Sequence, residues 1–296
     1  MVLTGLGGAT NTMAYRTGTY VHRIAYMTNP VAVIDGFTLT NGYENTTAYG
    51  GGVLMTTGRL QNCIVVKNTD AKLDDGRPVG GGVYASGGMI SNCMIAWNSS
   101  VGSYGKAGGL DAFNAVVQRC RIEANYSQEG NGGGIILQGG SRLENCLIRS
   151  NNMRAVFFMT ANKALLRNCT VVENTGGEAI SIWSDSTSCT GLNCIAYNNA
   201  VPDMTNYSAS SVVQYSCASN LVHGSNGNIT NNPLFVNRAV GDFRLQPRSP
   251  CADAGVVAGW TRADVDLDGK PRWSGPTVDM GAYEAPSSGG VVFVFR

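Results

Sequence analysis

The chain has 296 residues, of which 14% are charged, and its formal net charge is +1. A chain with so little net charge shows no sign of binding nucleic acid or an anionic membrane surface through its charge. No apolar run reaches the roughly 18 residues that a membrane-spanning helix needs, so we expect no transmembrane segment.

The chain opens on MVLTGLGG, which lacks the basic and apolar regions of a secretory signal. A first strand pattern follows in IDGFTLTN, where Ile34, Phe37 and Leu39 are the apolar positions. From residue 50 onward, two patterns alternate. The first is a glycine-rich strand that begins GGGVLM at residue 50 and returns, with variations, at residues 80, 107, 132, 154 and 177.

The second pattern is a phrase built around cysteine, such as LQNCIVVKN at residues 60–68. Apolar residues stand three before and two after the cysteine, and an asparagine closes each phrase. The cysteines are 30, 27, 26, 23 and 25 residues apart, which is the period of a repeat architecture. They are Cys63, Cys93, Cys120, Cys146, Cys169 and Cys194.

Short strands, this period and the absence of helical periodicity predict an all-β fold, a right-handed parallel β-helix (solenoid) of about seven rungs. The cysteines then form a buried interior column. The closing asparagines occupy turns, where we expect left-handed backbone geometry and stacked amides. A disulfide framework is the alternative, but stacked cysteines have poor geometry for bonding to one another. Zinc has little support, because no CxxC occurs and the histidines are only His22 and His223.

Regular repeats fade after Asn199, and we expect residues 1–211 to form the repeats. We expect residues 212–284 to form an irregular C-terminal cap packed on the coil, because an open coil end exposes apolar side chains and unpaired backbone. Residues 285–296 form a tail, in which VVFVFR at residues 291–296 is predicted as a terminal strand.

The cap phrases NPLF, DFRL, SPCADAG, DLDGKPR and VDMGAYE, in this order, resemble the C-terminal region of bacterial β-helix repeat proteins called choice-of-anchor Q proteins. The GGG and NC repeats are also similar, more generically, to those of chlamydial-type polymorphic outer-membrane proteins. The first resemblance implies an extracellular or cell-surface address and no particular reaction. It also implies a disulfide between Cys217 and Cys251, and an N-terminal cap and signal that are missing here. We therefore expect a fragment of a larger protein.

Loops of 6 to 11 residues follow the first four closing positions, and they shorten to 1 or 2 residues after Asn151. We predict that these loops form a wall with a step beside it. Aromatic rings beside carboxylates and amides suit sugar rings, so the wall is a candidate glycan site, although a plain solvated wall is the alternative. Its candidate ligand-binding residues are Tyr43, Tyr49, Asp74, Asp75, Arg77, Tyr104, Lys106 and Tyr126.

The outward face of the central rungs is a second candidate site. Arg121, Glu123 and Arg149 are candidate catalytic residues there, in a groove where arginine would neutralise a uronate and a base would abstract a proton. The alternative is a ladder of structural ion pairs between neighbouring strands. Other polar positions of this face are Arg119, Glu144, Arg167 and Glu173.

The segment DVDLDGK places Asp264, Asp266 and Asp268 like the start of a calcium-binding loop. Its twelfth position is Gly275 instead of glutamate, so the usual bidentate ligand is missing. A structural calcium is one interpretation. The other is that the aspartates hold turn backbone while Arg272 pairs with a carboxylate in the cap. We expect no other cofactor.

Taken together, the sequence predicts a secreted or cell-surface module that binds or presents ligands, with a polysaccharide or surface glycan as partner. An enzyme is the first alternative, either a polysaccharide lyase or a glycoside hydrolase acting on the outer strand face. A self-assembling structural protein is the second, because exposed strand edges at the ends would let coils stack end to end. We expect the protein to be either a monomer or an end-to-end assembly.

Overall fold

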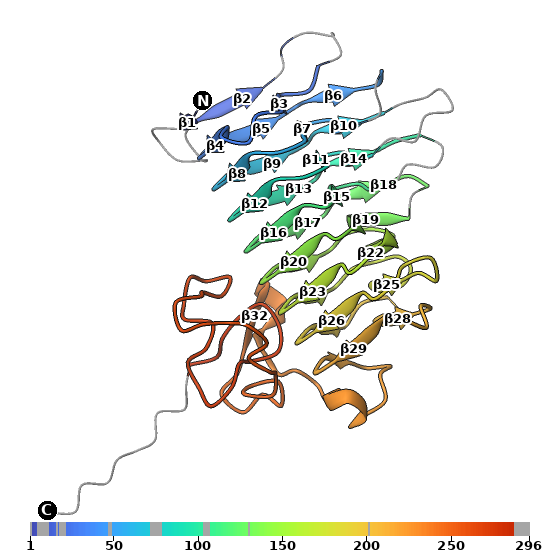
Figure 1. Ribbon diagram of the computed structural model, residues 1–296, viewed down its shortest axis with the longest axis vertical. Coiled ribbons are helices and arrows are strands. Elements are labelled where there is room, and N and C mark those ends of the chain that lie inside the picture. The colour runs from blue at the N-terminus through green and yellow to red at the C-terminus, as the bar shows by residue number, and fades with distance from the viewer. Residues whose placement is uncertain are drawn as a thin grey trace, which may run out of the picture.

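The computed structural model describes residues 2–4, 12–15, 17, 22–46, 49–71, 79–102, 107–129, 131–200 and 202–286. In these ranges the chain winds into a parallel β-solenoid whose rungs stack along the long axis (Figure 1). The only helical turns described are the short 3-10 turns η1 (Ser225–Gly227) and η2 (Arg238–Val240). No helix of the described residues is long and apolar enough to cross a membrane. The predicted all-β parallel β-helix is therefore confirmed.

Each full rung contributes strands to several parallel sheets, which we call sheets A to D. Sheet A contains β1 (Val2–Thr4), β4 (Val33–Asp35), β8 (Arg59–Gln61), β12 (Met89–Ser91), β16 (Val116–Gln118), β20 (Arg142–Glu144), β23 (Leu165–Arg167), β26 (Thr190–Leu192) and β29 (Val212–Gln214). Sheet B contains β2 (Met13–Tyr15), β5 (Thr38–Thr40), β9 (Ile64–Val66), β13 (Met94–Ala96), β17 (Arg121–Glu123), β21 (Leu147–Arg149), β24 (Thr170–Val172), β27 (Ile195–Tyr197) and β30 (Cys217–Ala218). Sheet C is shorter, with β6 (Tyr43–Glu44), β10 (Thr69–Asp70), β14 (Ser99–Ser100) and β18 (Tyr126–Ser127). Sheet D contains β3 (Ala25–Met27), β7 (Val53–Met55), β11 (Val83–Ala85), β15 (Leu110–Phe113), β19 (Gly132–Gly139), β22 (Arg154–Ala161), β25 (Ile180–Ile182) and β28 (Met204–Asn206).

The repeat phrases mark seven rungs. In sheet A, these rungs contain the middle seven of the nine strands, from β4 to β26. The two flanking strands, β1 and β29, extend the coil at its ends without a cysteine phrase. Because β29 pairs with β26 and β30 pairs with β27, the coil continues into the segment that the sequence assigned to the cap.

The six phrase cysteines form the predicted interior column at the corner between sheets A and B. All are free thiols and at most 3% exposed. Their sulfur atoms contact backbone groups of the same and the preceding rung, as when the Cys120 N–H donates to Sγ of Cys146 (3.3 Å). Phe37 occupies the same column in the first rung, since its N–H donates to Sγ of Cys63. Cys189 is also free and buried, beside Ala164 on the neighbouring rung.

The closing asparagines form a ladder of buried amides. The Nδ2 group of Asn98 donates to Oδ1 of Asn125 (3.1 Å), and Asn125 donates in the same way to Asn151 (3.0 Å). The prediction of stacked amides is confirmed, but the prediction of left-handed geometry at these asparagines is wrong. The left-handed residue is the one before, such as Trp97 (φ 51°) or Ala124 (φ 52°).

Left-handed geometry also explains why asparagine so often precedes the column cysteine. Asn62, Asn92, Asn145 and Asn168 all have φ between 50° and 52°. Asparagine tolerates this region better than most residues, so it is suited to the sharp corner between sheets A and B. Arg119 holds the same place in its rung, with φ 50°.

The glycine-rich strands pass close to the asparagine ladder. A Cβ atom at Gly82 would stand 2.8 Å from the side chain of Asn98 and 2.8 Å from the carbonyl of Gly109. Any larger residue at this position would therefore push the rungs apart. This lack of space explains why pairs of glycines recur at the start of these strands.

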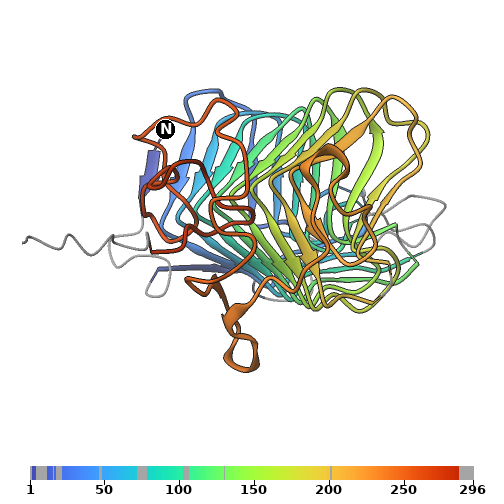
Figure 2. The ribbon, with the colours of Figure 1, turned by 90° about the horizontal axis from the view of Figure 1, so that it is seen from below.

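The segment after the coil has two parts with different places. Residues 219–232, which we call the end segment, lie at the last rung, where Ile229 bridges to Cys217 and Leu221 packs against the interior. Residues 233–286, which we call the flank segment, contain β31 (Phe235–Asn237) and β32 (Asp242–Leu245) and lie beside the coil (Figures 1 and 2). The predicted strand at residues 291–296 lies outside the described residues.

The flank segment packs on the outer face of sheet B and does not close the coil end, as a terminal cap would. Its buried residues Phe235, Phe243 and Met280 share one apolar cluster with Leu147 and Ile195 of the coil. The asparagines of the sheet A–B corner also bind it: Asn145 donates to the Val265 carbonyl (3.0 Å) and Asn168 to the Asp279 carbonyl (2.8 Å). Apolar outward-facing residues on the later rungs therefore have a covering partner.

Candidate functional site

The flank segment covers only the later half of the outer face of sheet B. Along one outward column, Leu147, Thr170 and Ile195 are at most 1% exposed. The earlier members of the same column, Met94 and Arg121, remain partly exposed. The boundary between covered and open rungs is where a ligand can approach both the coil and the flank segment.

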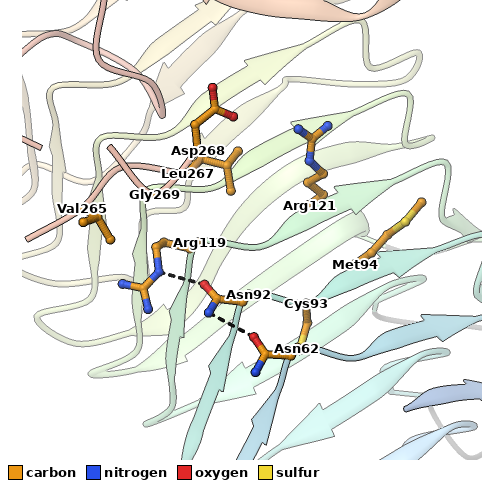
Figure 3. A pocket seen from close by; sticks show the side chains of 10 residues that line it. All are labelled: Asn62, Asn92, Cys93, Met94, Arg119, Arg121, Val265, Leu267, Asp268 and Gly269. Atoms are coloured by element: carbon orange, nitrogen blue, oxygen red, sulfur yellow. Dashed lines mark hydrogen bonds between the residues drawn. The ribbon is translucent and has the colours of Figure 1, made fainter. Parts of the chain in front are cut away.

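A cleft of about 490 Å³ lies at this boundary, and we call it the flank cleft. Figure 3 shows its walls, which come from parts of the chain more than 100 residues apart. The coil contributes Asn62, Asn92, Cys93, Met94, Arg119 and Arg121, and the flank segment contributes Val265, Leu267, Asp268 and Gly269.

A hydrogen-bonded row of corner residues forms one side of the flank cleft (Figure 3). Nε of Arg119 donates to Oδ1 of Asn92 (2.8 Å), and Nδ2 of Asn92 donates to Oδ1 of Asn62 (3.2 Å). Nδ2 of Asn62 donates in turn to Asp35 (2.7 Å). This row fixes the Arg119 guanidinium through Nε, while its terminal amino groups have no hydrogen-bond partner among the described residues.

Arg121 is the one predicted catalytic candidate that lines the flank cleft. Its side chain is 42% exposed, and its nearest carboxylate oxygen, on Glu123, is 3.8 Å away. Glu123 is bound more closely by Arg149 (3.0 Å) from the adjacent rung, and it is only 5% exposed. The Arg149 guanidinium lies 5.9 Å from the Phe243 ring of the flank segment.

The prediction of an open groove over the central rungs is therefore wrong for the rungs that follow Arg121, because the flank segment packs over them. The alternative of structural ion pairs describes these residues. Glu144 accepts from both Arg142 and Arg167 at 2.7 Å, and Glu173 pairs with Arg238 at 3.3 Å. The Arg167 guanidinium also stacks on Trp260, 3.6 Å from the ring centroid.

The three aspartates of DVDLDGK have separate partners. Asp266 is fully buried and accepts the backbone N–H groups of Asp268, Lys270 and Glu284. Asp264 binds Thr261, and Asp268 pairs with Arg244 (3.1 Å) at the flank cleft. No cluster of three metal-ligating side chains occurs within the described ranges. The turn-holding interpretation is the one that the structure supports, together with an Arg272–Glu284 ion pair at 2.6 Å. Calcium binding stays a prediction.

The loops of the predicted wall are only partly within the described residues, so the wall and its step stay predictions. The short strands of sheet C flank these loops, and sheet C ends at β18, where the side chain of Asn152 takes the place of a next strand with two 2.7 Å bonds to Ser127. Tyr126 is 49% exposed, and Tyr49 packs on Tyr84 with ring centroids 4.7 Å apart. Tyr43 lies three strands from Tyr126. Asp74, Asp75, Arg77, Tyr104 and Lys106 lie outside the described residues, so glycan binding by the wall stays a prediction.

The thiols of Cys217 and Cys251 lie together where the coil meets the flank segment. Both are fully buried and free in this structure. Their mutual hydrogen bond is the main cause that raises the pKa of Cys251, and burial adds to it. The two residues are thus neighbours, and the disulfide that the resemblance implies stays a prediction.

Sequence reasoning missed Trp97, which immediately follows β13, the strand that contributes Met94 to the flank cleft. Its side chain is 54% exposed although its backbone has φ 51°. Left-handed geometry is regular at this position of the repeat, but a bulky residue seldom adopts it. The signal was available in the repeat, because a large aromatic residue stands in IAWN where other rungs have lysine, alanine, serine or glutamate.

Comparison with known proteins adds little about function. No protein-family model matches the chain, and no curated protein matches it, so the choice-of-anchor Q resemblance stays an expectation. Among solved structures, the chain is similar to the crystal structure of pectate lyase Pel9A, with 12% sequence identity and a TM-score of 0.49. The alignment covers 93% of this chain and 86% of that chain. A similarity at this level gives no argument about activity.

Proposed function

We propose that the protein is a secreted or cell-surface β-helix module that binds an acidic polysaccharide in the flank cleft. The observation that carries the proposal is the charge of the cleft walls. Arg119 and Arg121 both offer guanidinium donors to the cleft, whereas its one carboxylate, Asp268, is already paired with Arg244. The uncompensated charge of the walls is therefore positive.

The remaining lining suits a sugar chain. Guanidinium groups bind planar carboxylates and sulfates through two parallel hydrogen bonds, which gives both strength and orientation. Asn62 and Asn92 offer amides for hydroxyl groups, and Met94 and Leu267 offer apolar surface for the C–H faces of sugar rings. Trp97, which follows the strand that carries Met94, is exposed and offers a ring on which a further sugar of a longer chain can stack.

We favour binding over catalysis because the lining of the flank cleft contains few groups that can react. Glycoside hydrolysis usually needs two carboxyl groups across the scissile bond, and the described lining supplies only Asp268. Proton abstraction by a lyase needs a base, and arginine does not lose its proton in proteins. The lining contains neither lysine nor histidine. Its donors can therefore hold an anionic sugar without an evident means to cleave it.

The test is a binding measurement by titration calorimetry with oligogalacturonate, heparin and alginate oligosaccharides, and with neutral dextran as reference. We expect binding of at least one acidic ligand that weakens with salt. Arg119→Gln and Arg121→Gln should each weaken it about tenfold or more, since a hydrogen bond to a charged group contributes about 1.5–3 kcal/mol. Arg248→Gln, which changes an exposed arginine outside the cleft, is the matched control.

Two results would contradict the proposal. One is that no acidic polysaccharide binds, and the other is that affinity is the same in both cleft variants as in the wild type. Release of unsaturated uronate, detected by its ultraviolet absorbance, would instead show a lyase acting at the site.

A further inference from the structure

The outer face of sheet D carries a row of five side chains, which we call the sheet D stripe: Phe113, Gln138, Met159, Trp183 and Tyr207. The register places them on successive rungs. Phe113 pairs with Gln138, and Met159 follows Phe158, the partner of Leu137. The N–H groups of Trp183 and Tyr207 bind the carbonyls of Phe158 and Ile182, which continues the row. At about 4.8 Å per rung, the stripe runs for roughly 19 Å along the coil axis.

A second apolar cluster, outside the coil interior, supports the stripe. Ile136 and Phe157 point outward from sheet D and are nevertheless fully buried, and Met159 and Trp183 pack on them. The Trp183 ring meets Phe157 edge-on, with centroids 5.0 Å apart and an interplanar angle of 83°. At the two ends, Phe113 is 41% and Tyr207 is 54% exposed. A fixed apolar surface therefore faces solvent where an outer sheet face is normally polar.

The charges beside the stripe are either buried or paired. Asp111 is fully buried and accepts from Nε2 of Gln138 (2.6 Å). Nε of Arg154 lies 2.7 Å from Oε2 of Glu178, and the guanidinium lies 5.7 Å from the Trp183 ring centroid. The Tyr207 hydroxyl donates to Oε1 of Glu178 (3.0 Å), which holds this exposed ring in place. An anionic or cationic ligand gains nothing from such a pair, so the stripe favours an uncharged ligand.

We propose that the sheet D stripe binds a chain of neutral sugars lying along the coil axis. The aromatic rings and the thioether of the stripe match the C–H faces of pyranose rings in an extended chain. Nε2 of Gln138 is bound to Asp111, and its Oε1 can accept a hydrogen bond from a sugar hydroxyl. A protein partner fits less well, because a stable interface buries about 800 Å² on each side and the stripe is one side chain wide. This site is separate from the flank cleft and does not depend on it.

The experiment measures depletion of the protein by microcrystalline cellulose and by chitin, and its affinity for soluble β-1,3-glucan and β-1,4-glucan hexasaccharides. Excess oligogalacturonate is present to occupy the flank cleft. The test variant is the double change Phe113→Ala and Tyr207→Ala, because both side chains are exposed and Trp183 has a packing role. Tyr15→Ala, which changes an exposed tyrosine on sheet B outside all the proposed sites, is the matched control.

We expect the wild type and Tyr15→Ala to bind at least one of these neutral glycans, and the double variant to bind it about tenfold or more weakly. Equal far-UV circular dichroism spectra would show that the variant is folded. Unchanged affinity in the double variant, or no neutral glycan retained by the wild type, would overturn the inference. A concentration-dependent dimer that disappears in the double variant, seen by light scattering, would overturn it in favour of a second copy of this chain.

Discussion

Replacing Asn125 with alanine should remove the middle of the amide ladder and destabilise the coil by about 4 kcal/mol. Its Oδ1 accepts from the N–H (3.0 Å) and the side chain (3.1 Å) of Asn98. Its Nδ2 donates to the Ile95 carbonyl (2.9 Å) and to Asn151 (3.0 Å). The estimate comes from four hydrogen bonds at about 1 kcal/mol each. The variant would also leave the buried groups of Asn98, Ile95 and Asn151 without these partners, so the loss of stability should not be smaller than this.

The assay is urea unfolding followed by far-UV circular dichroism, with the midpoint and slope of each transition compared. Asn125→Asp keeps the size of the side chain but loses both donors and buries a charge, so it should destabilise at least as much. Asn114→Gly is the control, because Asn114 is exposed, has φ 52° and accepts one bond from the Gly140 N–H (2.7 Å). An alanine variant within about 1 kcal/mol of the wild type would refute the claim that the ladder stabilises the coil.

Three further predictions concern other positions. Cys120→Ser should destabilise the protein by about 1–3 kcal/mol in the same urea assay, because it buries a hydroxyl in an apolar column, and Cys120→Ala should cost less. Gly82→Ala should lower the melting temperature by several degrees, because the new Cβ would stand 2.8 Å from the side chain of Asn98; an unchanged melting temperature would show that the rungs separate easily. Burial raises the pKa of Glu284, beside Arg272, from its usual 4.5 to about 8. A carboxyl group whose pKa is raised in the folded state contributes stability that is fully present below pH 4.5 and is lost as the pH rises through about 8. The melting temperature should therefore fall between pH 4.5 and about 8 in the wild type, and this fall should be absent in Glu284→Gln.

The coil could be predicted because its determinants are local and periodic. The spacing of Cys63, Cys93 and Cys120 is enough to place an interior column, and the glycine and asparagine positions follow from the same period. The backbone geometry within each phrase was harder, because asparagine is favoured both at the left-handed corner, as at Asn92, and in the amide ladder, as at Asn98.

The flank cleft could not be predicted in the same way. Its second wall depends on where residues 233–286 pack, and contacts such as Asn145 with Val265 join positions 120 residues apart with no period between them. The sequence predicts a cap in this region, because the apolar cross-section at the end of a coil needs cover. In the structure, the outside of the coil also needs cover, because Leu147 and Ile195 are apolar residues that point outward and pack against the flank segment.

The most direct test of the proposed function is a crystal structure of the protein with an acidic oligosaccharide that calorimetry has shown to bind. We predict that the sugar lies in the flank cleft, with a carboxylate or sulfate oxygen within hydrogen-bond distance of the guanidinium of Arg119 or Arg121. A ligand found on the tyrosines of sheet C, or at any place that leaves both arginines without contact, would contradict the account.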